Sequence, residues 1–271
     1  MNNNKSMTER QKREIEYHRE HAELHKDILE KPFNFDVVTN KSRRWWNAYW
    51  DMYTYLLSKD IKGKNVLVVG CGFGSDALRL SKAGANVKAF DLSPESLFIA
   101  KKLSDKEGLN IEYREMSAEK INYENNYFDI VLARDILHHV DIPESISEII
   151  RVSKPGAIFC FNEIYSHSIA DRIRHSNFVE NWLYPKMVNF VYDGKKPYIT
   201  MDERKLTEKD VDDIVAIVKP EIIKYFSFII TRILPDKYLT LGKIDRILLT
   251  ILSPISYILG GRVLVTGELK K

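Results

Sequence analysis

Three glycines separated by single residues follow an apolar run in NVLVVGCGFGSDALRL, residues 65–80. Glycines between a buried strand and a helix let the backbone approach a bound molecule closely. Asp91 follows at nearly the distance that suits a carboxylate for binding a ribose. His138 and His139 come later, and imidazoles are the side chains that most often transfer protons. These residue types predict a nucleoside-like ligand on the glycines and proton-transfer groups near it.

The glycine run is compatible with more than one ligand. A triphosphate loop needs a lysine and a hydroxyl residue after its second glycine, and neither is present. Gly72, Gly74 and Ala77 fit the dinucleotide pattern G-x-G-x-x-A, so an NAD-dependent oxidoreductase is one alternative. Asp76 argues against it, because a carboxylate in the first helical turn repels a pyrophosphate. An adenosine ligand without phosphate avoids that conflict.

The surrounding elements must bring these residues together. Short apolar runs alternate with amphipathic helical patterns, which predicts an α/β fold with a doubly wound, mostly parallel sheet. Ligands of such sheets bind at the carboxyl ends of the strands. Two later apolar runs are expected to extend the sheet at its far edge. The seven expected strands lie within 65–70, 86–91, 110–116, 127–134, 157–164, 221–230 and 261–269.

Four motifs within residues 64–163 resemble those of a class I S-adenosyl-L-methionine-dependent methyltransferase of the small-molecule type. They are VLVVGCGFG, AFDLSPESLFIAKK, EMSAEKINYENNYFDIVLARDILHHV and RVSKPGAIFCFNE, in this order and at the family's spacing. The resemblance implies a Rossmann-like seven-stranded sheet and S-adenosyl-L-methionine as cofactor. It also implies methyl transfer, which we expect at an oxygen or nitrogen of a small or lipid-like acceptor.

The resemblance also implies roles for individual residues. Asp91 would bind both ribose hydroxyls, and the backbone carbonyl of Arg134 would meet the methionine ammonium. Val68 and Ser117 stand where the family usually has acidic residues, which leaves open a catalytically inactive partner subunit. The expected cofactor-binding residues are Gly70, Cys71, Gly72, Gly74, Asp91, Leu92, Ser117, Ala118 and Arg134.

A base is required only when the acceptor must lose a proton. His138 and His139 are the expected catalytic candidates, and the alternative is a structural histidine hydrogen-bonded under the cofactor. The N-terminal helix of such proteins often folds over the cofactor, so Tyr17, His18, Arg43 and Trp46 are expected lid contacts. No metal site is expected. The histidines at positions 18, 21 and 25 share a helical face, which we interpret as solvated.

We expect a single domain over residues 1–271. Its parts are an N-terminal helical extension over 1–63, a cofactor-binding core over 64–164, a helical cap insertion over 165–206, and C-terminal helices and edge strands over 207–271. The aromatic stripe Trp46, Tyr49, Trp50 and Tyr53 is expected to pack on the sheet. The aromatic cap suggests a small or lipid-like acceptor.

Charge and cysteine content narrow the partners. The net charge is only +3, which gives no case for nucleic acid. Two distant cysteines and a polar N-terminus predict a cytoplasmic protein. The apolar stretch 247–261 is too short for a membrane span and contains Pro254. We expect a buried or interfacial helix there, with Lys243, Arg246 and Arg262 leaving peripheral membrane contact open.

Overall fold

The sheet of the computed structural model has seven strands in the order β3-β2-β1-β4-β5-β7-β6. The structure describes residues 7–183, 185–186, 204–228 and 239–270. β7 runs antiparallel to both of its neighbours, and the other pairings are parallel. The predicted doubly wound, mostly parallel sheet is therefore confirmed. The strands are β1 (Asn65–Val69), β2 (Asn86–Asp91), β3 (Glu112–Glu115), β4 (Phe128–Arg134), β5 (Ser153–Ile164), β6 (Val218–Phe226) and β7 (Arg262–Leu269).

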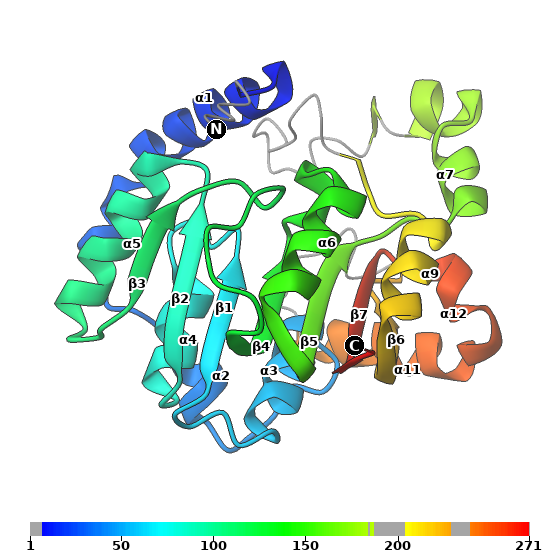
Figure 1. Cartoon of the computed structure of the whole chain (residues 1–271). Helices are drawn as coiled ribbons and strands as arrows, with labels where there is room; N and C mark the ends of the chain where they lie inside the picture. The colour runs from blue at the N-terminus through cyan, green and yellow to red at the C-terminus, as the bar shows by residue number, and fades with distance from the viewer. Residues whose placement is uncertain (1–6, 184, 187–203, 229–238, 271) are drawn as a thin grey trace.

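Helices cover both faces of the sheet, which explains why its strands are apolar on both sides (Figure 1). Alternate residues of a strand point to opposite faces, so Val66 and Val68 of β1 join one core while Leu67 and Val69 join the other. The first core lies under α3 (Ala48–Leu57), α4 (Ser75–Lys82) and α5 (Pro94–Lys106). The second lies under α6 (Ile142–Val152) and α9 (Glu208–Ile217).

Local signals set the starts of the core helices. Ser93 accepts a hydrogen bond from the amide of Ser96, and Pro94 occupies the first turn of α5, as its sequence predicts. Asp141 caps α6 in the same way through the amide of Glu144. These caps fix where the chain leaves the sheet, and so they fix the turns that face a ligand.

The N-terminal extension is helical, as expected. It contains α1 (Glu9–Leu24), a 3-10 turn (Lys26–Leu29), α2 (Asp36–Thr39) and α3. In Figure 1, α1 runs along the upper edge of the sheet, beside α5. Trp50 and Tyr53 are buried where α3 packs on β5 and β7, which confirms the predicted packing for these two residues of the aromatic stripe. Tyr49 is half-buried, and Trp46 precedes α3 and is also half-buried.

The expected cap insertion is described only in part. It begins with α7 (Ser168–Arg174) and a π-helical turn (Val179–Leu183), and residues 184 and 187–203 lie outside the described residues.

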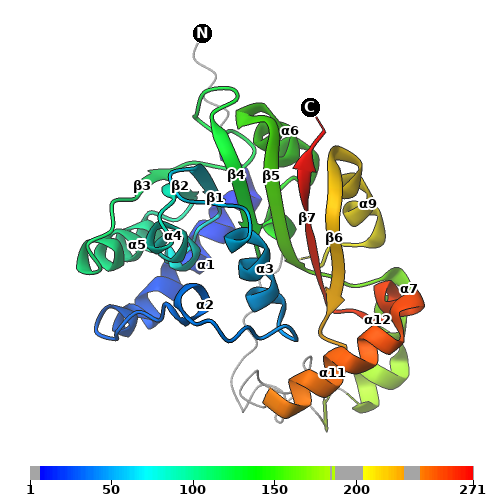
Figure 2. The same cartoon turned by 90° about the horizontal axis from the view of Figure 1, so that it is seen from below.

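The apolar stretch 247–261 is not one helix. It spans the end of α11 (Leu239–Ile251), a 3-10 turn at Pro254 (Ser253–Ile255) and α12 (Ser256–Leu259), seen in Figure 2. Of the two expected alternatives, a buried or an interfacial helix, the buried one is wrong, since Ile251 is 70% exposed and Ile247 is 46% exposed. Among the described residues, no helix is both long enough and apolar enough to cross a membrane.

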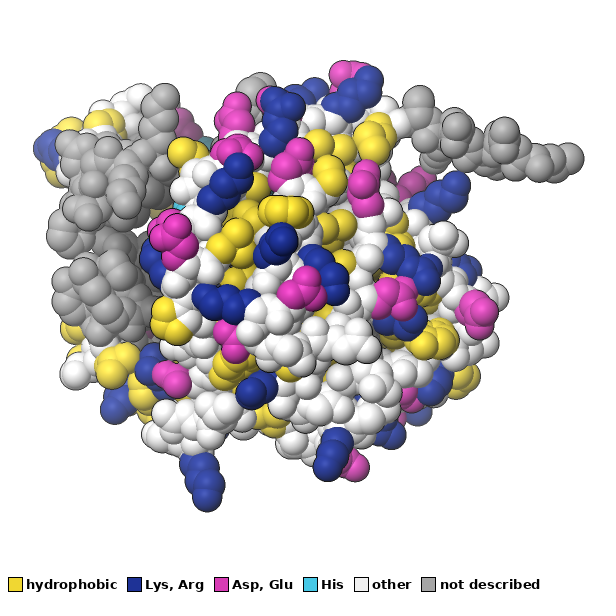
Figure 3. Space-filling view, turned by 90° about the vertical axis from the view of Figure 1, so that its left-hand side faces the viewer, with side chains coloured by type: hydrophobic (Ala, Val, Ile, Leu, Met, Phe, Trp, Pro, Cys, Tyr) yellow, Lys and Arg dark blue, Asp and Glu magenta, His cyan; other side chains and the backbone are white. Residues whose placement is uncertain are grey.

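Side chains of both charges share the face beside β3 and α5. Lysines and arginines lie among aspartates and glutamates there, without a field of one sign (Figure 3). This face therefore offers no concentrated basic surface.

Candidate functional site

A cavity of about 260 Å³ lies at the carboxyl ends of β1, β2 and β4, where the fold predicts a ligand. We call it the cofactor cavity. Its walls come from α1, from the turn between β1 and α4, and from the segments that follow β2, β3 and β4. Most of the residues predicted to bind the cofactor line it. These are Gly70, Cys71, Gly72, Asp91, Leu92, Ser117, Ala118 and Arg134.

The three glycines after β1 have different roles. All three have positive φ, between 52° and 77°. A Cβ on Gly72 would meet no atom within 4 Å, so the space beside its α-carbon is open. A Cβ on Gly74 would lie 2.8 Å from both the Ala100 side chain and the Tyr113 hydroxyl. Gly74 does not line the cavity, and its placement as a cofactor contact is corrected to a packing role at the start of α4.

Asp91 uses both oxygens to hold the turns around it. Its Oδ2 accepts from the Gly72 amide at 2.7 Å, and its Oδ1 accepts from the Ser93 amide at 3.0 Å. Each carboxylate oxygen has two lone pairs, so one acceptor position remains on each. Asp91 also lines the cofactor cavity, which leaves it able to accept further hydrogen bonds from a ligand.

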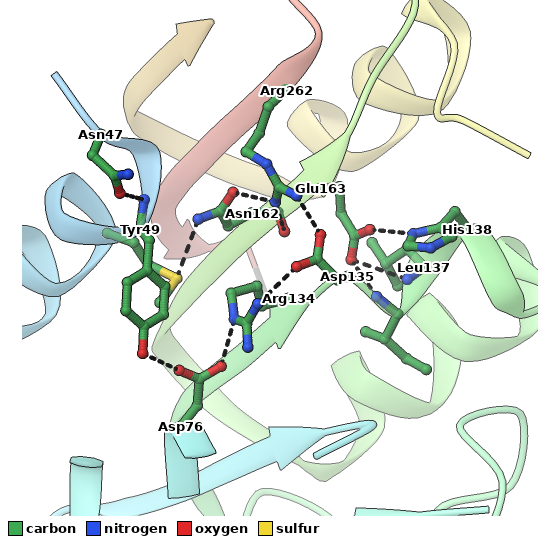
Figure 4. A network of polar contacts seen from close by, with 12 residues as sticks. Asn47, Tyr49, Asp76, Arg134, Asp135, Leu137, His138, Asn162, Glu163 and Arg262 are labelled. Atoms are coloured by element: carbon green, nitrogen blue, oxygen red, sulfur yellow. Dashed lines mark hydrogen bonds and ion pairs between the residues drawn. The ribbon is translucent and has the colours of Figure 1, made fainter. Parts of the chain in front are cut away.

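The two adjacent histidines have different surroundings, although their ring centroids are only 4.1 Å apart. His138 Nδ1 lies 2.9 Å from Oε2 of the fully buried Glu163, whose other oxygen accepts from the amides of Ile136 and Leu137 (Figure 4). His138 thus fixes the segment after β4 and does not line the cofactor cavity. His139 does line it, so of these two histidines His139 is the one that can contact a bound molecule.

Asp76 has a different environment from the one its position suggested. Its carboxylate accepts from the Tyr53 hydroxyl at 2.8 Å. It also accepts from the Tyr49 hydroxyl at 3.2 Å and pairs with Arg134 Nε at 2.6 Å (Figure 4). Burial disfavours the charge of Arg134, yet Asp76 and Asp135 raise the pKa of its guanidinium. Asp76 is paired with Arg134 and does not line the cavity, so it would not repel a pyrophosphate there, contrary to the expectation from the sequence. The strand order argues against a dinucleotide fold instead, since that fold has the order 3-2-1-4-5-6.

Helix α1 closes the cavity, which the sequence did not predict in detail. Gln11, Glu14 and His18 line the cavity from this helix. Gln11 Nε2 donates to Ser117 Oγ at 3.2 Å, and Arg10 pairs with Glu119 at 2.5 Å. Positions 11, 14 and 18 share one helical face, so this polar spacing was the available signal.

The other expected lid contacts lie elsewhere. Tyr17 packs its ring against His18 outside the cavity lining. Arg43 donates to the backbone oxygens of Val37 and Trp50 within the extension, so its side chain is not available to the cavity. Trp46 lines a neighbouring cavity. The lid assignments of Tyr17, Arg43 and Trp46 are therefore wrong for the cofactor cavity, whereas that of His18 agrees with the geometry.

The histidine face of α1 is not simply solvated. The His21 ring stacks on Phe73 of the glycine turn with centroids 5.1 Å apart. Burial, with the neighbouring His25 and His18, lowers the pKa of His21 to about 4. Burial likewise lowers the pKa of His18. Among the described residues, no group of three or more histidine, cysteine or acidic side chains is arranged to hold a metal ion.

Comparison with known proteins gives one family. A model described as a methyltransferase domain matches residues 67–161. A ubiquinone biosynthesis O-methyltransferase of Actinobacillus pleuropneumoniae is 35% identical over 108 residues, which are 38% of this chain and 46% of that protein. The protein of the same name from Paraburkholderia xenovorans is 28% identical over 151 residues, which are 49% and 63% of the two chains. The chain thus spans about half the length of the curated relatives it matches.

Solved structures share the whole fold at low sequence identity. A geranyl diphosphate C-methyltransferase from Streptomyces coelicolor, solved with Mg²⁺, geranyl diphosphate and S-adenosyl-L-homocysteine, has a TM-score of 0.60 at 12% identity. The alignment covers 97% of this chain and 98% of that one. A magnesium protoporphyrin IX methyltransferase from Synechocystis, solved with S-adenosyl-L-homocysteine, has a TM-score of 0.58 at 13% identity, with 97% and 100% covered.

These findings agree on one family. The matched segment begins in β1 and ends in β5, so it contains the turn and the strand ends around the cofactor cavity. Both solved methyltransferases align with 97% of this chain, which establishes the fold independently of sequence identity. Residues 67–161 therefore match a methyltransferase domain, and the chain has the Rossmann-like fold of the solved S-adenosyl-L-methionine-dependent methyltransferases.

Proposed function

We propose that this protein transfers a methyl group from S-adenosyl-L-methionine to an oxygen or nitrogen of a small or lipid-like acceptor. One observation carries the proposal. The open α-carbon of Gly72 and the carboxylate of Asp91 face one cavity from adjacent strand ends. A glycine that leaves space and a carboxylate with free lone pairs suit an adenosyl group whose sugar diol needs acceptors.

The residues of the cofactor cavity fit this cofactor. Asp91 would accept from the ribose hydroxyls, and Leu92, Ser117 and Ala118 would lie along the adenine. The backbone carbonyl of Arg134, with Gly70, Cys71 and Gly72 of the turn, would hold the methionyl part. When bound, the cofactor supplies a methyl group already activated by its sulfonium.

The protein then has two tasks, alignment and exclusion of water. Helix α1 covers the cavity through Gln11 and Glu14, which suits the second task. His139 is the group placed to take a proton from a hydroxyl or amine acceptor. His138 acts only through Glu163, which holds the segment that carries both histidines.

The relatives support the acceptor class. These relatives are named for O-methylation in ubiquinone biosynthesis, so an aromatic hydroxyl of a quinone-type precursor is the acceptor type we favour. We also propose that the chain acts as one domain in the cytoplasm. The free thiols of Cys71 and Cys160 fit a reducing compartment.

Calorimetric titration with S-adenosyl-L-homocysteine and, separately, NAD tests the proposal. We expect the first to bind and the second not to bind. A screen of phenolic acceptors with methyl-labelled donor then tests transfer. Tight binding of NAD alone would favour the oxidoreductase. A folded protein that binds no S-adenosyl compound would favour an inactive partner subunit, which the buried Val68 at the usual acidic position motivates.

A further inference from the structure

A second cavity, which we call the side cavity, lies beside the cofactor cavity at the ends of β4, β5 and β6. It measures about 200 Å³ and shares Arg134 and Asp135 with the cofactor cavity. The first residues of α3 and Arg262 at the start of β7 complete its walls. A molecule in the side cavity would therefore be the immediate neighbour of a molecule in the cofactor cavity.

Two arginines line the side cavity, with one carboxylate between them. Oδ2 of Asp135 accepts from Nη1 of Arg134 at 2.7 Å, and Oδ1 pairs with Nη2 of Arg262 at 2.8 Å (Figure 4). Asp76 takes Nε of Arg134, and no described residue accepts from the remaining Nη2. Nη2 of Arg134 therefore remains a donor without an acceptor among the described residues.

A third cation stands at the same cavity. The ammonium of Lys243, on α11, lies 4.7 Å from the ring centroid of Trp46, which lines the side cavity. Lys243 forms no ion pair within the part of the chain that the structure describes. Arg134 and Arg262 pair with the carboxylates of Asp76 and Asp135, and Lys243 adds a third cation beside the cavity. The surroundings carry an excess of positive charge.

The acceptor atoms of the lining are largely in use. Each Asp135 oxygen lies close to a guanidinium nitrogen, Oδ2 at 2.7 Å from Arg134 and Oδ1 at 2.8 Å from Arg262, and Asn162 Oδ1 accepts from Arg262 at 2.9 Å. Burial would raise the pKa of Asp135, but Arg262 and Arg134 hold it below its usual range, so the carboxylate remains charged. Asp135 and Ser227 have φ of 54° and 57°, an uncommon backbone conformation that concentrates at functional sites.

We propose that the side cavity is the acceptor site and that it selects acceptors carrying a small oxyanion, either a carboxylate or a phosphate. This inference rests on the proposed methyl transfer. Arginine matches oxyanions in geometry as well as in charge, and Lys243 adds a point charge at the rim. Trp46 and Phe226 offer apolar surface for the body of the same molecule.

Binding to the full chain saturated with S-adenosyl-L-homocysteine tests this inference. The probes are 4-hydroxybenzoate, its neutral analogue 4-hydroxybenzamide and inorganic phosphate, each titrated by calorimetry. We expect the benzoate to bind about tenfold or more tightly than the amide. Lys243→Gln should weaken benzoate binding about two- to fivefold and leave the affinity for S-adenosyl-L-homocysteine unchanged. Lys219→Gln, at an exposed position of β6 outside the cavity, is the matched control and should change neither.

Three results would overturn the inference. They are equal binding of benzoate and amide, equal effects of the two lysine variants, and binding of none of the probes by protein that does bind S-adenosyl-L-homocysteine. Phosphate binding tighter than benzoate would support the site and identify a phosphorylated acceptor. Benzoate binding by protein that fails to bind S-adenosyl-L-homocysteine would support the anion site and contradict the proposed function.

Discussion

Replacing Asp91 by asparagine is the substitution whose consequences the structure defines best. Asp91 receives two amide hydrogen bonds, from Gly72 at 2.7 Å and from Ser93 at 3.0 Å. Asparagine keeps the shape but has only one acceptor oxygen, and its amide group would face a second donor. A hydrogen bond to a charged group contributes about 1.5–3 kcal/mol, so we expect the free energy of unfolding to fall by about that amount.

The same substitution should weaken cofactor binding separately. Loss of the charged partner of the sugar diol is expected to cost about 1–3 kcal/mol, which is a roughly 5- to 150-fold rise in the dissociation constant of S-adenosyl-L-homocysteine. Urea unfolding measures the first effect, and calorimetry on the folded variant measures the second.

Asp129→Asn is the control for this experiment. Asp129 also accepts a backbone amide, that of Asn65 at 3.0 Å, and pairs with Lys154 at 2.7 Å, but it lies at the opposite end of the sheet. The Asp129→Asn variant should have a lower free energy of unfolding but an unchanged affinity for S-adenosyl-L-homocysteine. The ribose assignment is refuted if the affinity of Asp91→Asn matches that of the wild type, or if Asp129→Asn weakens binding equally.

Three further predictions concern the glycine turn, the histidine pair and the lid. Gly74→Ala should lower the free energy of unfolding by about 1–3 kcal/mol because of backbone strain and overlap with Ala100. Gly72→Ala shares the strain but not the overlap, so it should lower the free energy of unfolding less and raise the dissociation constant of S-adenosyl-L-homocysteine more. The reverse pattern in urea unfolding and calorimetry would contradict the two roles. His138→Gln should destabilise the fold by about 1–3 kcal/mol. His139→Gln should keep the stability and slow methyl transfer to a hydroxyl acceptor about 10²- to 10⁴-fold. Equal transfer rates in His139→Gln and the wild type would exclude a base at His139. The pKa of His21 is about 4 in the folded protein and near 6.5 when unfolded, so the unfolded form binds more protons between these values and acidification destabilises α1 in that range. The rate of hydrogen exchange in α1, corrected for intrinsic rates, should therefore rise from pH 7 to pH 5. The substitution His21→Gln should reduce this rise.

The core of the fold was predictable because its signals are local. The apolar strands, the cap at Ser93 and the positions of Gly72 and Asp91 all follow from short stretches of sequence. Parallel strands bring their carboxyl ends to one edge, so the meeting of Gly72 and Asp91 follows from the topology.

The corrections concern contacts between distant segments. A glycine is needed both where a ligand approaches and where elements pack closely, so the sequence cannot separate Gly72 from Gly74. The partners of Asp76 come from α3 and β4, and no local pattern predicts that Arg134 neutralises it. His138 and Glu163 are brought together by the same kind of long-range packing.

A crystal structure of the protein, from crystals grown with S-adenosyl-L-homocysteine, is the most direct test of the central claim that the cofactor cavity holds an adenosyl cofactor. We predict the sugar hydroxyls within hydrogen-bonding distance of Asp91, with the adenine along Leu92 and Ala118 and the amino acid end at the turn around Gly72. A well-ordered cavity that contains no ligand, or a sugar that lies away from Asp91, would contradict this claim.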